Sequence, residues 1–164
     1  LQIAKQMWSD DNGPYHGTHY QLAETLNEPQ PISSPHPRIL VGGSGEKKTL
    51  RMVAQYADAC NVSMANGIDV LSHKLDVLRG HCERLGRDYA DIEKTVSGGF
   101  QRISRSGEEG TTSPDAVLSR LEQLAALGVD TTLFSIGAID EPESRALMER
   151  EIIPAAHALA VAGR

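Results

Sequence analysis

The sequence has 164 residues, a formal charge of −6 and only 4% aromatic residues. Its lysines and arginines are scattered, with no basic block or aromatic ladder, so we expect no nucleic-acid partner. No apolar run approaches the roughly 20 residues that cross a bilayer, and residues 1–8 are amphipathic rather than a signal peptide. We therefore expect a cytoplasmic protein without a membrane partner.

The first 37 residues predict a short, irregular region. Residues 1–9 have the pattern of the end of an amphipathic helix, with Ile3 and Met7 facing inward. Residues 15–22 predict a small hairpin around Gly17. Residues 27–37 contain four prolines, which fix their own backbone and bias each preceding residue away from helix. This stretch should be an extended connector.

Four strand–helix units are expected to follow. Ser113 is a suitable N-cap with Pro114 at the first helical position, and Gly86 suits the residue after a helix end. Pro154 should break or kink the last helix. In chain order, the expected units are strand 38–42 with helix 46–57, strand 59–63 with helix 68–85, strand 92–98 with helix 114–127, and strand 131–136 with a helix from about Pro142.

Alternating strands and helices predict a parallel sheet covered by helices. An open doubly wound sheet and a (β/α)8 barrel both fit this pattern, and four units would be half of a barrel. In either architecture, ligands bind at the carboxyl ends of the strands. An apolar run at the end of the first expected strand leads directly into the glycines at positions 42, 43 and 45.

This glycine turn predicts an anion site. Glycines let backbone N–H groups approach an oxyanion, and the first turn of a following helix adds unpaired donors and partial positive charge. The same glycines could serve only to make the corner. A P-loop is excluded because Glu46 follows Gly45 where lysine is required, and a dinucleotide fingerprint fails because Lys48 occupies the place of its last glycine.

Polar side chains near the turn have simpler interpretations. Glu46 should cap the following helix outward. Lys47 and Lys48 could offer charge to a phosphate, but lysines in the first turn of an outer helix usually face water, which is the interpretation we favour. His73 and His81 fall on the polar side of helix 68–85 and should be solvated. His16 and His19 lack the further ligands of a closed metal site, so we expect no metal. The two cysteines, Cys60 and Cys82, should be buried thiols rather than a disulfide.

Residues 37–61, which include the glycine turn, strongly resemble the luciferase-like monooxygenase superfamily, and most of all its branch that uses the deazaflavin coenzyme F420. Five shorter stretches carry the same resemblance: residues 6–8, 15–20, 73–79, 86–88 and 92–95. The likeness covers residues 1 to about 100 and weakens beyond them.

The resemblance implies a single partial domain, α/β in class, that is the C-terminal half (strands 5–8) of a (β/α)8 TIM barrel. In it, residues 1–37 contain the helix end, the hairpin and the proline-rich connector, and residues 38–164 contain the four βα units. It also implies that the cofactor phosphate lies against Gly42, Gly43, Ser44 and Gly45, and beside Asn61 and Val62.

The cofactor implied is coenzyme F420, with FMN as the alternative, and the substrate is a small organic molecule. In this family, the residues over the flavin ring come largely from the first half of the barrel, so no catalytic residue is assigned. We expect that this part alone binds the cofactor phosphate and transfers no hydride, and that the protein is a homo-oligomer. The alternatives are an FMN-dependent monooxygenase and a non-catalytic half-barrel remnant that acts as a packing or assembly unit.

Overall fold

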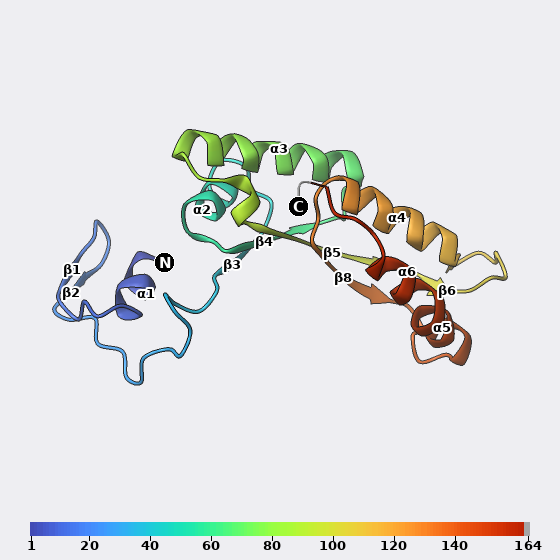
Figure 1. The fold of residues 1–164 in the computed structure, drawn as a ribbon, viewed down its shortest axis with the longest axis horizontal. Helices are drawn as coiled ribbons and strands as arrows, with labels where there is room; N and C mark the ends of the chain where they lie inside the picture. Colours follow the sequence, from blue (N-terminus) through green and yellow to red (C-terminus); the bar gives the residue numbers. More distant parts are fainter. Residues whose placement is uncertain (163–164) are drawn as a thin grey trace. The chain divides into compact units, whose positions relative to one another are not determined.

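A computed structural model describes residues 1–162 (Figure 1). The chain divides into two compact units, Leu1–Ile39 and Leu40–Arg164. Within the described residues, no helix is long and apolar enough to cross a membrane.

The first unit contains a short helix and a hairpin. Helix α1 spans Gln2–Met7, and strands β1 (Tyr15–His16) and β2 (Gln21–Leu22) pair antiparallel. The Gly17 N–H donates to the carbonyl of Tyr20 at 2.9 Å, which closes the hairpin expected around this glycine. Residues 23–39 form no helix or strand, in agreement with a proline-rich connector.

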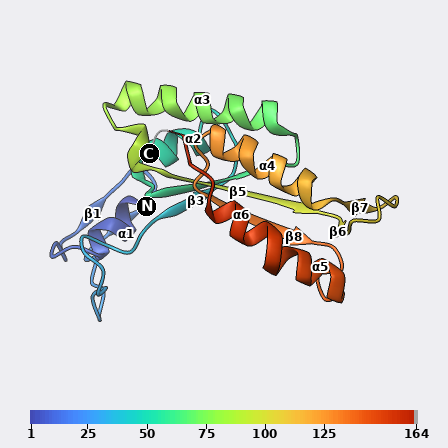
Figure 2. The same cartoon turned by 45° about the vertical axis from the view of Figure 1, so that its right-hand side comes forward.

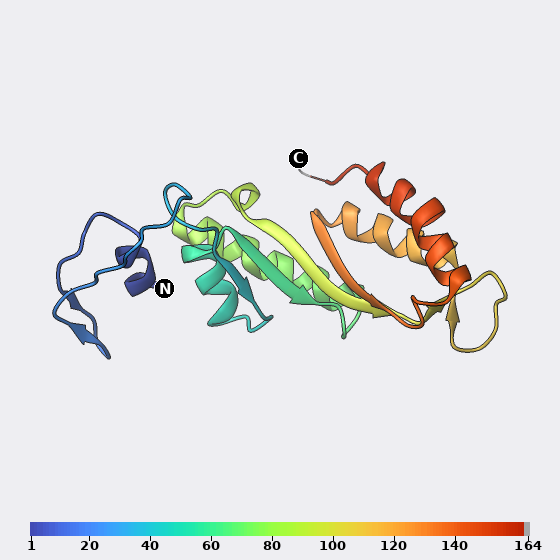
Figure 3. The same ribbon diagram turned by 90° about the horizontal axis from the view of Figure 1, so that it is seen from below.

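The second unit is built on a four-stranded parallel sheet. Its strands are β3 (Leu40–Gly42), β4 (Ala59–Ser63), β5 (Glu93–Phe100) and β8 (Thr131–Ile136), in the order β3-β4-β5-β8. Figure 3 shows the two long strands β5 and β8 side by side, and they pair from Thr95↔Thr131 to Phe100↔Ile136. A separate small parallel pair joins β6 (Arg102–Ile103) to β7 (Thr111–Thr112). The outer strands β3 and β8 are therefore the edges of the main sheet.

Each strand of the main sheet is followed by a helix. Three of these helices are α2 (Thr49–Tyr56), α3 (Ile68–Leu85) and α4 (Pro114–Ala126), and a 3₁₀ turn η1 (Tyr89–Asp91) precedes β5. The expected caps are present: Ser113 Oγ accepts from the N–H of Ala116 at 3.2 Å, and Gly86 closes α3 at φ 65°. Gly86 therefore marks the C-terminal end of α3, and Ser113 marks the start of α4.

One expected helix boundary is wrong, and the last helix is irregular beside its proline. Helix α2 begins at Thr49 rather than at residue 46, because residues 46–48 form turns and the Leu50 N–H reaches back to the Gly45 carbonyl at 3.0 Å. Pro154 was expected to break or kink the last helix; the helix does not end there, but its regular α-helical pattern is interrupted just before the proline. Pro154 is accommodated near the start of α6 (Ile153–His157), which continues from α5 (Pro142–Leu147) through a π-helical segment, Met148–Ile152.

The two faces of the main sheet differ in burial. Side chains that alternate along β4 and β5, including Val62 and Val96, are buried beneath the helices, and α3 and α4 lie on this same side (Figures 1 and 2). The opposite face is largely uncovered: Leu40 is 55% exposed and Leu133 is 54% exposed. The register places Gly42, Asn61 and Thr95 in one row across this second face.

Candidate functional site

The glycine turn leaves the sheet at the end of edge strand β3. Gly42 pairs with Asn61 of β4, and the Gly43 N–H then donates to the Asn61 carbonyl at 2.9 Å. The ladder thus extends one residue past the strand and fixes where the turn begins. The Gly43 N–H is consequently unavailable to a ligand, so Gly43 could approach a phosphate only without donating its amide.

The three glycines have different roles. Gly43 has φ 116°, a conformation that side chains with a Cβ rarely adopt, and a Cβ there would lie 3.2 Å from Thr49 Cγ2. A Cβ at Gly45 would lie 3.0 Å from Thr49 Oγ1. By contrast, a Cβ at Gly42 would meet no atom within 4 Å. Gly43 is therefore required by the backbone of the turn, a side chain at Gly45 would crowd Thr49, and Gly42 leaves open space on the uncovered face.

The remaining amides of the turn are candidates for anion binding. The backbone N–H groups of Ser44, Gly45 and Glu46 have no hydrogen-bond partner within residues 1–162. The Ser44 side chain also makes no hydrogen bond to these residues, and Ser44 is half-buried. Successive unpaired donors just before a helix N-terminus form a concentration of partial positive charge suited to a phosphate.

Asn61 is held in a fixed orientation beside the turn. Its Nδ2 donates to Thr95 Oγ1 at 2.9 Å, and the Thr95 hydroxyl donates to the carbonyl of Cys60 at 2.8 Å. Because the single hydroxyl proton is used by Cys60, Thr95 must accept from the amide. Asn61 Oδ1 is left as an acceptor next to Gly42, and no sequence motif indicated this role for Thr95.

Val62, the other residue expected beside the phosphate, lies on the opposite side of the sheet. Its side chain is 1% exposed and belongs to the core beneath the helices. Only its backbone could approach a ligand at the uncovered face, because successive residues of a strand point to opposite sides.

Glu46, directly after the glycines, is held by α3. Its Oε1 accepts from Lys74 Nζ at 2.5 Å and lies 3.2 Å from His73 Nε2. The hydrogen bond from Lys74 lowers the pKa of the Glu46 carboxyl below its ordinary value. Glu46 makes no capping hydrogen bond to α2, whose N-cap position is Lys48, so the expectation that Glu46 caps this helix is wrong.

His81 holds the backbone of the same residue. Its Nε2 lies 2.8 Å from the Glu46 carbonyl, and its Nδ1 lies 3.0 Å from Arg84 NH2. Arginine can only donate, so Nδ1 accepts from Arg84 and Nε2–H donates to the carbonyl. The expectation that His81 is simply solvated is therefore wrong, and His73, although exposed, also contacts Glu46.

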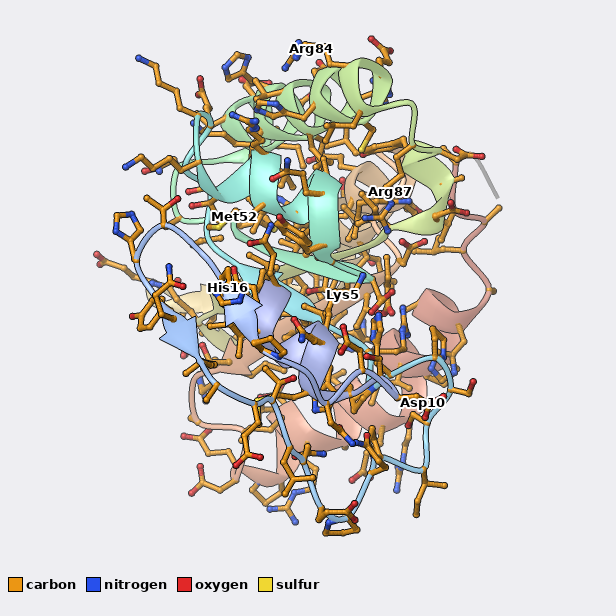
Figure 4. All side chains as sticks on the ribbon, turned by 90° about the vertical axis from the view of Figure 1, so that its left-hand side faces the viewer. Lys5, Asp10, His16, Met52, Arg84 and Arg87 are labelled. Carbon is orange, nitrogen blue, oxygen red and sulfur yellow. The ribbon has the colours of Figure 1, made fainter. Side chains whose placement is uncertain are left out.

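Arg87, just beyond α3, anchors the other end of α2 (Figure 4). Its guanidinium donates to the carbonyls of Val53 at 3.3 Å, Ala54 at 3.2 Å and Ala57 at 2.7 Å. These are carbonyls at the C-terminal end of the helix, where a cation also interacts favourably with the macrodipole. Helix α3 and the turn after it therefore fix both ends of the segment formed by the glycine turn and α2.

Two further polar features of this unit are structural. Lys94 and Asp130 make a buried ion pair at 3.5 Å that joins β5 to the start of β8. Burial raises the pKa of the Cys60 thiol to about 11, as expected of an inert buried cysteine. Across residues 1–162, no group of three or more His, Cys, Asp or Glu side chains could hold a metal ion.

A model of the luciferase-like monooxygenase family matches residues 1–101, which is more than half of the chain and includes the glycine turn and Asn61. The chain belongs to this family. Residues 1–164 are also similar to the FMNH2-dependent dimethylsulfone monooxygenase of Pseudomonas putida, with 26% identity over 92 residues. That match covers 52% of this chain and 25% of the relative.

Solved structures show the same fold. An F420-dependent secondary alcohol dehydrogenase in complex with an F420-acetone adduct superposes with a TM-score of 0.73 at 12% identity, over 93% of this chain and 58% of that one. The coenzyme F420 dependent tetrahydromethanopterin reductase of Methanopyrus kandleri gives 0.70 at 14% identity, over 93% and 61%. A riboflavin lyase with modified FMN gives 0.72 at 10% identity, over 95% and 55%.

These matches establish the fold as part of a luciferase-like TIM barrel, and the chain spans about three-fifths of the length of these solved relatives. The four parallel strands, each followed by a helix, correspond to the expected half-barrel with the glycine turn after its first strand. The open doubly wound sheet is therefore excluded.

Proposed function

We propose that this chain is the part of a luciferase-like oxidoreductase that binds the phosphate of a flavin or deazaflavin cofactor. The observation that carries the proposal is that the successive amides of Ser44, Gly45 and Glu46, beside the open space at Gly42, have no partner in the described part of the chain. A phosphate needs several donors and close backbone approach, and the successive unpaired amides and the open space at Gly42 support a site of this kind.

The residues have distinct roles in this proposal. The amides of the turn and the Ser44 hydroxyl donate to phosphate oxygens, while Gly42 leaves the approach unobstructed. Asn61, oriented by Thr95, offers its amide oxygen to the neighbouring part of the cofactor. Glu46, His81 and Arg87 contact no ligand and hold the turn and α2 in place.

Coenzyme F420 is the cofactor we favour, and FMN is the alternative. Two solved relatives are F420-dependent enzymes, whereas the curated relative is FMNH2-dependent. When bound, either cofactor would supply the redox chemistry toward a small organic substrate, and the protein would position it and exclude water. In this proposal, residues 1–164 alone transfer no hydride.

Gly42→Val provides the most direct test. Gly43 is a poorer choice because its positive φ means that a valine there would distort the turn as well as block it. In the complete gene product, Gly42→Val should weaken cofactor binding in a fluorescence titration by at least about tenfold, since hydrogen bonds to a charged phosphate contribute about 1.5–3 kcal/mol each.

Leu40→Val is the matched control, because Leu40 lies on the same strand and the same face but away from the turn. It should leave cofactor affinity unchanged. Equal affinity for the wild-type protein and Gly42→Val, with both folded, would refute the phosphate site. A complete gene product that binds neither cofactor would instead support a non-catalytic packing unit.

A further inference from the structure

A hollow of about 440 Å³ lies on the helix-covered side of the second unit, between the turn after β4, the C-terminal parts of β5 and β8, strand β7 and helix α4. We call it the aromatic hollow. Its volume falls in the range of small-molecule pockets, which is about 300–1,000 Å³. Its lining includes Met64, Gly98, Phe100, Thr112, Arg120 and Phe134.

Two aromatic rings form the floor of this hollow. Phe100 and Phe134 are the only phenylalanines in the chain, and their rings meet edge to face with the centroids 4.7 Å apart. Both side chains are half-buried, because they pack against the apolar core and also line the hollow. Aromatic pairs prefer this edge-to-face arrangement, so a further ring bound in the hollow could extend it.

Strand β5 contains two consecutive glycines beside these rings, although glycine weakens a strand. A Cβ at Gly98 would lie 2.9 Å from Cε1 of Phe134, so a side chain there would displace the ring. Because Gly98 and Gly99 have no side chains, the backbone of the strand itself lines the hollow. Glycines inside a strand often mark a place where a ligand approaches the backbone closely.

Arg120 places an unpaired cation in the lining of the hollow. The side chain is half-buried, and its guanidinium has no hydrogen bond or ion pair within residues 1–162. None of the residues three or four positions away on α4 is acidic, so the helix itself offers no partner. A guanidinium recognises a carboxylate through two parallel hydrogen bonds. An anionic ligand would give Arg120 the partner that the described chain does not supply.

Thr112 adds a second polar group to the same lining. Its hydroxyl has no hydrogen-bond partner in the described part of the chain, and the residue is half-buried. Its backbone is fixed, because its carbonyl accepts from the Ser104 N–H at 3.2 Å. A hydroxyl can donate one hydrogen bond to a carboxylate oxygen. The hollow therefore combines an aromatic floor with two kinds of donor for a carboxylate.

We propose that the aromatic hollow binds a small aromatic carboxylate. The ring of this ligand packs against Phe100 and Phe134, and its carboxylate accepts hydrogen bonds from Arg120 and Thr112. The site is separate from the proposed phosphate site, because the glycine turn follows β3 at the opposite edge of the sheet from β8, and the space at Gly42 opens on the uncovered face. The ligand of the hollow is therefore a second organic molecule, distinct from the cofactor.

The test compares benzoate with benzamide by calorimetric titration of the complete gene product. The two probes share the ring, and only benzoate carries a negative charge. We expect benzoate to bind at least about tenfold more tightly, because a hydrogen bond with an ionised partner is roughly twice as strong as a neutral one. Equal affinities for the two probes, or no binding of benzoate, would overturn the proposal. Gly42→Val should bind benzoate as the wild type does, and a loss in this variant would place benzoate at the glycine turn instead.

Arg120→Gln is the matching variant, and Arg150→Gln is the control on an exposed arginine outside the hollow. Arg120→Gln should reduce the affinity for benzoate about tenfold and leave that for benzamide unchanged, whereas Arg150→Gln should alter neither. Ala116→Leu narrows the hollow from an exposed position of α4 and should weaken the binding of both probes. Unchanged benzoate affinity in Arg120→Gln or Ala116→Leu, or equal losses for both probes in Arg120→Gln, would refute the hollow as a carboxylate site.

Discussion

Lys74 donates a hydrogen bond of 2.5 Å to the carboxylate of Glu46, the residue that immediately follows the glycine turn. The lysine side chain is 19% exposed, and the glutamate side chain is 41% exposed. This contact and the hydrogen bond from His81 to the Glu46 carbonyl connect the turn to two positions of α3 that lie two helical turns apart on one face. Glu46 is therefore an acidic residue close to a proposed anion site. We infer that it contributes to cofactor binding by positioning the turn, since its charge would repel a phosphate.

The variant Glu46→Gln distinguishes charge repulsion from positioning, because the two effects change cofactor affinity in opposite directions. Removal of a negative charge near a phosphate should tighten binding if Coulomb repulsion dominates. If positioning dominates, loss of the ion pair with Lys74 should weaken binding by about two- to fivefold, the range expected of a partly exposed pair. We expect weaker binding, measured by fluorescence titration of the complete gene product. Tighter binding would show that Glu46 does not position the turn.

Low pH should break the hydrogen bond between Lys74 and Glu46. The pKa of Glu46 is lowered in the folded protein by the Lys74 hydrogen bond. The stabilisation is therefore complete above the ordinary pKa of 4.5 and is lost as the pH falls through the lowered value. Native-state hydrogen exchange should show the hydrogen-bonded amides on either side of the turn, those of Gly43 and Leu50, losing protection below about pH 4.5 in the wild-type protein. In Glu46→Gln, protection of these residues should be low already at neutral pH.

Ser44→Ala should have a moderate effect on affinity. The hydroxyl has no partner within the described residues, so its removal costs the fold nothing. A hydrogen bond to a charged phosphate contributes about 1.5–3 kcal/mol, and the half-buried Ser44 should fall at the lower end of this range, which corresponds to a loss of cofactor affinity of about tenfold. A loss far beyond this in the same titration would indicate that Ser44 has a role other than one donor among several.

Loss of Lys94 should destabilise the fold without altering the phosphate site. The Lys94 and Asp130 side chains are 6% and 4% exposed, and Lys94 Nζ lies 4.9 Å from the centre of the Tyr89 ring. Lys94→Met leaves a buried carboxylate without its cation and should cost about 3–5 kcal/mol of unfolding free energy in urea titrations. Lys94→Met with Asp130→Asn should recover part of this loss. An unchanged midpoint for Lys94→Met would show that the pair contributes nothing.

Residues 1–164 alone should self-associate. The edge strands β3 and β8 present unpaired backbone groups, and Leu40 and Leu133 are 55% and 54% exposed on the uncovered face of the sheet. Light scattering should show species larger than a monomer, and Leu133→Lys should reduce their proportion. A monodisperse monomer with cooperative unfolding would contradict this prediction.

Local signals in the sequence determined most of the fold. Strand–helix alternation gave the parallel sheet, and the apolar stripe with Gly86 placed α3 at Ile68–Leu85. Ser113 and Pro114 placed the start of α4, and the glycines placed the turn after β3. Each of these signals acts within a few residues of its effect, so the sequence contains it directly.

Only the tertiary structure decided how the turn is held and which of its donors are available. The Gly43 amide is used by Asn61, Glu46 is held by Lys74 and His81, and Thr95 orients Asn61. The partners in these contacts lie far apart in the sequence, and they meet only because the sheet register and the packing of α3 bring them together. On a helix, a polar side chain that faces solvent and a polar side chain that hydrogen-bonds to a neighbouring element occur at the same positions of the helical repeat. The sequence pattern therefore could not distinguish the two cases.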